Sequence, residues 1–281
     1  MTARSEWDAL AKWRDFRMGE RGDLWHRALI DPALLRILGS VRGLRVLDVG
    51  CGNGYLTRRL KRLGATQSVG VDAANASIQL ARRREAAHPT GAEFLRADAA
   101  RLTQFEDGSF DRVVANMSLM DIRDAAATIR EVGRLLDPRG RFVCSISHPC
   151  FDLDEQSAWV VERRPYRETI ARKIEGYRRE RSVRVPWKVS DTEMAYTTSF
   201  HRTLATYSRY LNEAGLVILR LDEPAPKPEL IRKSPQGRFI AEIPLHLVIE
   251  AAHKGTFLGP RTRAARAKPK VPRQSRKSTR P

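Results

Sequence analysis

The sequence predicts an α/β fold in which a parallel β-sheet carries helices on both faces. Short apolar runs typical of buried strands alternate with segments of helical periodicity across residues 44–150. A loop with three glycines follows the first of these strands, and an acidic residue follows each of the next two. Repeated strand–helix–strand units form parallel sheets with right-handed crossovers, so these observations together predict this fold class.

Residues 1–43 are expected to form an N-terminal helical cap, because their aromatic side chains give the stretch enough apolar weight to dock on the rest of the chain. Asp31 followed by Pro32 predicts the N-cap and the first residue of a helix. Gly39 is expected to end this helix.

The elements of the main domain can be traced from the apolar pattern that follows. Helical spacing predicts helices over 55–63, 75–84 and 204–214, and one that carries Ile129–Leu136 and ends in a turn at 137–140. The expected strands cover 46–49, 68–71, 93–96, 110–115, 142–147, 217–221 and 246–251. These elements define a domain over residues 44–254.

Residues 151–200 interrupt the alternation of predicted strands and helices, because arginines and lysines mix with aromatic residues there. We expect an insertion over the edge of the sheet that acts as a lid on the substrate site.

Charge is unevenly distributed along the 281 residues, whose formal net charge is +18. From Lys254 onward there are ten basic residues and no acidic one, so residues 255–281 are expected to form a disordered basic tail. No apolar run could span a bilayer, and residues 1–7 do not have the apolar character of a signal peptide. Three cysteines without CxxC spacing indicate neither a disulfide framework nor a zinc site. We therefore expect a cytoplasmic protein without a metal or a membrane partner.

The glycine loop is the strongest functional signal. The run Val46–Leu56 places Gly50, Gly52 and Gly54 between a buried strand and a helix, where glycine lets a ligand approach the backbone. The dinucleotide fingerprint GxGxxG would put its third glycine where Tyr55 stands. S-adenosylmethionine carries ammonium and sulfonium charges where a dinucleotide carries a pyrophosphate. Asp48, two residues before the first glycine, would suit such a cation, although it could instead brace the loop.

Three further residues stand at the carboxyl ends of strands, where open α/β sheets bind ligands. Asp72 could accept hydrogen bonds from both ribose hydroxyls, or cap a helix. Asp98 could take the adenine amino group, or belong to a turn. Asn116 ends the fourth strand, where cofactor and substrate are expected to meet.

Together, VLDVGCGNG, VGVDA, RADA and FDRVVANMSLMDI resemble the class I S-adenosylmethionine-dependent methyltransferases of the small-molecule bacterial type. The resemblance covers roughly residues 44–150 and continues more loosely to about 250. It implies a Rossmann-like three-layer sandwich with a seven-stranded, mostly parallel sheet whose last strand is antiparallel. It also implies that Gly22–His26 belong to the N-terminal cap. The cofactor contacts it implies come from Asp48, Gly50, Gly52, Asp72, Ala73, Asp98, Ala99 and Asn116, to which the loop adds Gly54.

Methyl transfer is an in-line displacement that depends on alignment and on exclusion of water. An oxygen or nitrogen acceptor can also require a base. His148, after the fifth strand, and His201, before the late helix, are the catalytic candidates, unless they only cap or pack. Asp121 and His26 are further candidates.

The expected reaction is methyl transfer to an oxygen or nitrogen atom of a small-molecule acceptor. The alternative is an RNA methyltransferase that uses the basic tail and surface. Against methylation of a base amine, the fourth strand is followed by Met117 and Ser118 rather than by two prolines and an aromatic residue. A metal-dependent enzyme is disfavoured because Ser145–His148 contain no carboxylate. A third possibility is a cofactor-binding protein without catalysis.

Overall fold

The computed structural model describes residues 3–153 and 157–258. Its central sheet has seven strands in the order β10-β11-β5-β4-β1-β2-β3. Strands β1 to β5 pair in parallel, and β11 is antiparallel to both of its neighbours, which confirms the predicted topology. The strands are β1 (Arg45–Val49), β2 (Gln67–Asp72), β3 (Glu93–Arg96), β4 (Phe110–Asn116), β5 (Leu136–Ser147), β10 (Leu216–Asp222) and β11 (His246–His253).

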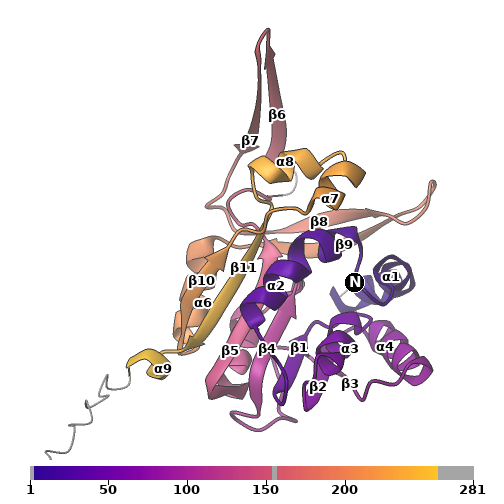
Figure 1. Ribbon diagram of the computed structural model, residues 1–281, viewed down its shortest axis with the longest axis vertical. Coiled ribbons are helices and arrows are strands. Elements are labelled where there is room, and N and C mark those ends of the chain that lie inside the picture. Colours follow the sequence, from indigo (N-terminus) through magenta and orange to yellow (C-terminus); the bar gives the residue numbers. More distant parts are fainter. Residues whose placement is uncertain (1–2, 154–156, 259–281) are drawn as a thin grey trace, which may run out of the picture.

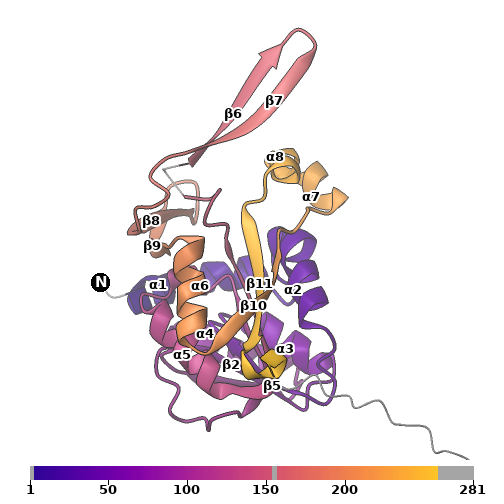
Figure 2. The same ribbon diagram turned by 90° about the vertical axis from the view of Figure 1, so that its left-hand side faces the viewer.

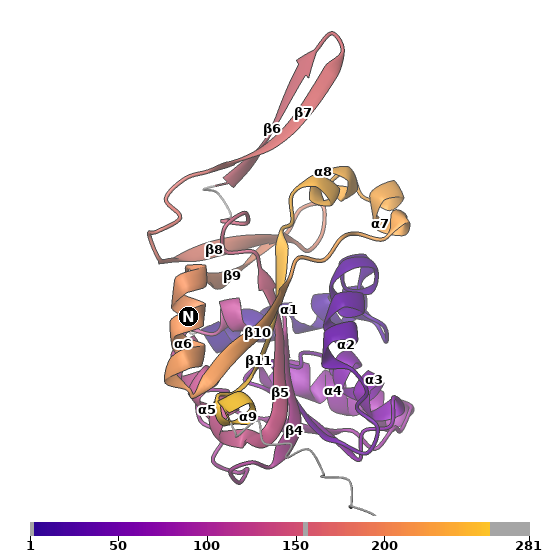
Figure 3. The same ribbon diagram turned by 60° about the vertical axis from the view of Figure 1, so that its left-hand side comes forward.

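Helices cover both faces of this sheet, and Figure 3 shows the two layers on either side of it. One layer contains α2 (Asp31–Leu38), α3 (Tyr55–Arg62) and α4 (Asn75–Ala87), and the other contains α5 (Ala125–Leu135) and α6 (Leu204–Glu213). Successive strand residues point to opposite faces, so Val113 joins the core beside α5 and α6 while Val114 joins the core beside α2 and α3. The three-layer sandwich follows from this alternation.

The N-terminal cap consists of α1 (Ala3–Met18) and a π-helical turn η1 (His26–Ile30) that leads into α2. Helix α1 packs against α4 and against strand β9 of the insertion. Gly39 follows the last residue of α2, as predicted. The predicted N-cap role of Asp31 is wrong, because its side chain is fully buried and accepts a hydrogen bond from Tyr55 instead.

Strand β5 begins earlier than the sequence predicts. Residues 137–140 are expected from their composition to form a turn, but they continue the strand directly from α5. Leu136 pairs with Phe110, and the register shifts before Arg141 pairs with Arg112. This irregular pairing accommodates Pro138 and Gly140, the two residues that favour a turn.

The insertion forms two β-hairpins. The first pairs β6 (Ser157–Arg164) with β7 (Arg167–Ile174), and the second pairs β8 (Arg181–Lys188) with β9 (Met194–His201). Figures 1 and 2 show β6–β7 as an arm that extends away from the sheet, while β8–β9 lies close to the domain. Only the second hairpin therefore lies where the predicted lid would be.

The remaining short elements lie between or after the strands. A 3₁₀ turn η2 (Leu119–Asp121) follows β4, and α7 (Pro228–Lys233) and α8 (Gly237–Glu242) connect β10 to β11. The predicted tail begins with a short helix, α9 (Gly255–Leu258), which corrects the expectation of disorder for these four residues. The rest of the predicted tail, 259–281, lies outside the described residues. In the part of the chain that is described, no helix has the length and apolar character needed to cross a membrane.

Candidate functional site

A cavity of about 600 Å³ lies at the carboxyl ends of β1, β2, β3 and β4. Its volume is within the range of small-molecule sites. Helix α1 and η1 provide the opposite wall, through Trp7, Ala11, Arg14, Asp15, Met18 and His26. A separate hollow lined by residues 17–24 and Arg27 contains none of the predicted site residues.

The glycine loop joins β1 to α3 and forms part of this cavity. A Cβ atom on Gly50 would overlap the Ser118 side chain, and one on Gly54 would overlap the Phe94 ring. At Gly52 a Cβ atom would meet no atom within 4 Å. Gly50 and Gly52 line the cavity but Gly54 does not, so the structure does not bring Gly54 to the predicted cofactor contact. Gly54 is instead required by packing and by its φ of 76°.

Asp48 and Asp72, two of the predicted cofactor-binding residues, both line the cavity. Asp48 is 2% exposed and accepts a hydrogen bond of 2.7 Å from the Thr57 hydroxyl. Burial raises the pKa of Asp48 to about 7, and the nearby charge of Asp72 acts in the same direction. Burial also raises the pKa of Asp72.

Asp72 holds the two loops beside it. Its carboxylate accepts one hydrogen bond from the Gly52 amide, at 2.9 Å, and another from the Ala74 amide, at 2.8 Å. The acid at the end of β2 thus fixes the part of the glycine loop that faces the cavity.

The other predicted cofactor contacts also lie at the cavity. Ala73 follows β2, and Asp98 and Ala99 follow β3. Asp98 accepts a hydrogen bond of 3.1 Å from the Ala100 amide, as a turn residue does.

Asn116 lines the cavity at the end of β4, with both ends of its amide engaged. Its Nδ2 donates to Tyr55 Oη at 2.9 Å and to Asp31 Oδ1 at 3.1 Å. Its Oδ1 accepts from Ser145 Oγ at 2.6 Å. These bonds fix one wall of the cavity.

Comparison with known proteins identifies this arrangement. A family model described as a methyltransferase domain matches residues 47–144. A solved S-adenosylmethionine-dependent methyltransferase from Mesorhizobium loti is 30% identical and has a TM-score of 0.62, over 78% of this chain and 95% of that one. The chain belongs to the S-adenosylmethionine-dependent methyltransferases. This methyltransferase also shares its fold with a protein from Listeria monocytogenes described as a putative S-adenosylmethionine-dependent methyltransferase, at 23% identity and a TM-score of 0.64 over 82% of this chain and 96% of that one.

Curated relatives match a shorter part of this methyltransferase. A ubiquinone biosynthesis O-methyltransferase from Nitrosococcus oceani is 34% identical over 116 residues, which are 40% of this chain and 48% of that protein. A demethylmenaquinone methyltransferase from Lactococcus lactis is 32% identical over 139 residues, which are 48% of this chain and 53% of that protein. The chain spans about half the length of the curated relatives it matches.

S-adenosylmethionine is the methyl donor of this family, and the cavity of this methyltransferase fits it. The open space at Gly52 admits close approach of a ligand to the backbone. Several carboxylates line the cavity, including the deeply buried Asp48, and such a lining suits a ligand with sulfonium and ammonium charges.

The two predicted catalytic histidines do not line this cavity. The chain beyond β5 turns toward β11, so the His148 amide donates to Leu245 O and its Nε2 lies 2.9 Å from Glu223 Oε1. His201 ends β9 with its Nε2 2.7 Å from Tyr177 O. Both side chains have partners elsewhere in the fold, so the structure does not bring these two predicted residues to the cavity.

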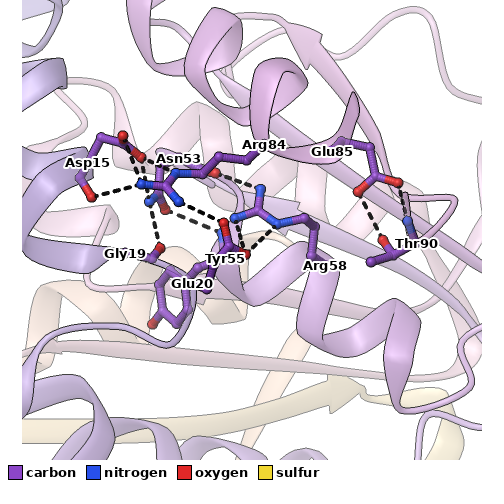
Figure 4. A network of polar contacts seen from close by, with 9 residues as sticks. All are labelled: Asp15, Gly19, Glu20, Asn53, Tyr55, Arg58, Arg84, Glu85 and Thr90. Carbon is purple, nitrogen blue, oxygen red and sulfur yellow. Dashed lines mark hydrogen bonds and ion pairs between the residues drawn. The ribbon is translucent and has the colours of Figure 1, made fainter. Parts of the chain in front are cut away.

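The contribution of α1 cannot be read from the sequence, which predicts a cap but none of its contacts. Figure 4 shows the ionic network that fastens this helix to α3 and α4. Arg84 binds Asp15 through two nitrogens and Glu20 at 2.7 Å. Arg58 binds Glu20 at 3.1 Å, and Asn53 Nδ2 donates to Asp15 at 2.9 Å. The acids at one end of α1 are visible in the sequence, but their partners lie 38 or more residues away.

Proposed function

We propose that this chain transfers the methyl group of S-adenosylmethionine to an oxygen or nitrogen atom of a small-molecule acceptor by in-line displacement. The observation that carries the proposal is one cavity that joins the glycine loop and the strand-end acids to the cap helix. Alignment and exclusion of water are the main requirements of such a displacement. The packed helix that walls the cavity supports this proposal, because it shields one side of the site from solvent.

In this proposal each strand end has a role toward the cofactor. Gly50 and Gly52 let the methionine part approach the loop, and Asp48 lines the cavity with them, where a bound cation would favour its ionised form. Asp72 accepts hydrogen bonds from the ribose hydroxyls, and Ala73 lies beside it. Asp98 and Ala99 contact the adenine, while Asn116 lies where cofactor and acceptor meet.

The second hairpin packs on the cap helix that forms one wall of the cavity. The Thr198 amide of β9 donates to Glu6 of α1 at 2.9 Å. The Trp187 ring of β8 packs against two tryptophans of α1. Its centroid lies 6.1 Å from that of Trp7 and 5.8 Å from that of Trp13. We propose that α1 and β8–β9 together act as the lid. The names of the two curated relatives, a ubiquinone biosynthesis O-methyltransferase and a demethylmenaquinone methyltransferase, favour a ring-bearing acceptor.

Calorimetric titration with S-adenosylhomocysteine tests the proposal. We expect wild type to bind and Asp72→Ala to lose on the order of a hundredfold in affinity, because the proposed hydrogen bonds from the ribose hydroxyls disappear and the Gly52 amide loses its partner. Asp191→Ala is the matched control, since this carboxylate is 97% exposed and pairs only with Lys188 in the described structure. Failure of folded wild type to bind, or equal affinity in all three proteins, would overturn the proposed site.

A further inference from the structure

His26 differs from the other described histidines in its relation to the cavity. It lines the cavity from the π-helical turn η1, and its side chain is 8% exposed. Its Nδ1 lies 2.8 Å from Asp23 Oδ1, and Asp23 does not line the cavity. The Nδ1 edge therefore points away from the cavity, which leaves the Nε2 edge on the cavity side.

Asp23 is held as an anion. Burial alone would raise the pKa of Asp23, but the hydrogen bonds from the His26 ring and backbone amide and the charge of Arg14 hold it well below its usual range. Arg14 Nη1 lies 3.8 Å from the second carboxylate oxygen, Oδ2. The His26 backbone amide also donates to Asp23 Oδ1 at 3.0 Å. The carboxylate is thus fixed from three directions.

An ionised carboxylate at Nδ1 determines which ring nitrogen carries the proton. Nδ1 donates to Asp23, so Nε2 of the neutral ring carries a lone pair. Within the described residues, no protein group forms a hydrogen bond with Nε2. The His26 ring also packs edge-on against Tyr55, with centroids 5.9 Å apart, and this contact fixes its orientation.

We propose that His26 is the general base of the methyl transfer and that Asp23 is its positioning residue. This inference rests on the proposed function of the cavity. The acceptor hydroxyl gives its proton to His26 Nε2 while its oxygen forms a bond to the methyl carbon. The bond between this carbon and sulfur breaks, and its electron pair stays on sulfur. The products are the methyl ether, S-adenosylhomocysteine and an imidazolium whose charge Asp23 balances.

The base defines the chemistry of the acceptor. An imidazole removes a proton efficiently only from a hydroxyl whose acidity approaches its own. Phenols and enols meet this condition better than alcohols do. The cavity wall also presents Trp7 and Met18 of the cap helix and Met117 after β4, which suit a flat apolar ring. The geometry therefore points to a phenolic or enolic hydroxyl compound as the acceptor class.

Other charged and titratable groups also face this pair, from several elements. Asp31 of α2 and His246 of β11 interact electrostatically with His26, and Arg14 of α1 with Asp23. The pH dependence of the methyl-transfer rate would reflect the titration of all of these groups together. The test therefore measures directly whether a bound phenol is protonated or ionised.

The probe is 4-nitrophenol, whose phenolate absorbs visible light while the phenol does not. Full-length protein saturated with S-adenosylhomocysteine is titrated with it at a pH where the free probe is mostly protonated. We expect bound probe to become phenolate in wild type. His26→Gln should bind the probe without forming phenolate, and Asp23→Asn should form less phenolate because the imidazolium loses its counter-charge. His88→Gln is the matched control, since His88 is exposed at the end of α4.

Each outcome has a defined meaning. Loss of S-adenosylhomocysteine binding by wild type contradicts the proposed function itself. If the cofactor product binds but the probe does not, or if phenolate forms equally in His26→Gln, the base assignment is overturned and the cofactor site stands. Normal affinity of each variant for S-adenosylhomocysteine shows that the variant has folded.

Discussion

Gly50, Gly52 and Gly54 occupy one loop but meet different neighbours. All three have positive φ, which glycine adopts without strain. Close contact with Ser118 explains why a side chain does not fit at Gly50, and close contact with Phe94 explains the same at Gly54. Open space lies beside Gly52. A sequence motif cannot separate these cases, because the packing partners lie 40 or more residues further along the chain.

Alanine substitutions separate these roles. Gly54→Ala should destabilise the fold by about 3 kcal/mol or more, because left-handed strain is added to overlap with Phe94. Gly52→Ala should cost only about 1–2 kcal/mol of strain, yet weaken S-adenosylhomocysteine binding by occupying the approach to the loop. Urea unfolding and calorimetry measure the two effects. Unchanged affinity in a folded Gly52→Ala variant would contradict a close approach of ligand at this position.

Asp48 should make the stability of the cofactor-free protein depend on pH. Burial raises its pKa from the ordinary value of 3.8 to about 7, so the folded state favours the neutral carboxyl. This contribution is fully present below about pH 4 and is lost as pH rises through 7. Relative to Asp48→Asn, wild type should lose up to about 4 kcal/mol over that interval. Urea unfolding at several pH values measures this difference, and parallel curves for the two proteins would contradict it.

At the scale of elements, the strands of the sheet could be predicted because apolar runs end at polar or glycine residues. The expected strand over 93–96 matches β3, and the one over 110–115 is one residue shorter than β4. The hairpins of the insertion cannot be predicted in this way, because arginines at both odd and even positions of β6, β7 and β8 obscure the alternation.

The site was predictable where local pattern determines it and not where long-range contacts do. Asp48, Asp72 and Asp98 stand at strand ends, so parallel pairing brings them to one edge. The side-chain directions of His148 and His201 depend on Glu223 and Tyr177, which no local pattern indicates. The same holds for Asp31, whose partner Tyr55 lies 24 residues away.

The attachment of α1 should contribute to cofactor affinity. Arg84 is the centre of the network in Figure 4, and Arg84→Gln removes its charged bonds to Asp15 and Glu20. We expect the binding free energy of S-adenosylhomocysteine to weaken by on the order of 1–2 kcal/mol, because α1, which forms one wall of the cavity, loses the ion pairs that hold it in place. Arg209→Gln is the matched control, since Arg209 and Glu213 form an exposed pair on α6. Equal affinity in both variants would show that α1 needs no such fastening.

At the scale of the whole molecule, binding and charge are placed in different regions. Every residue that lines the cavity lies between Trp7 and Asp124. The β6–β7 arm extends away from the sheet, with five of its residues basic and two acidic. The densest positive charge follows Leu258, where nine basic residues and no acidic one occur. A small-molecule acceptor requires only the first region, whereas an RNA acceptor would also use the others.

A protein ending at Leu258 distinguishes these two acceptor classes. Because the cavity is complete within residues 7–124, this shorter protein should bind S-adenosylhomocysteine as tightly as the full chain. Its log affinity for single-stranded RNA should fall less steeply with log salt, by about 0.7 in slope for each phosphate that the basic segment neutralises in the full chain. If methylation of a phenolic acceptor survives this truncation unchanged while RNA binding weakens, the segment binds polyanions independently of catalysis. A drop in cofactor affinity on truncation would instead mean that residues after Leu258 complete the site.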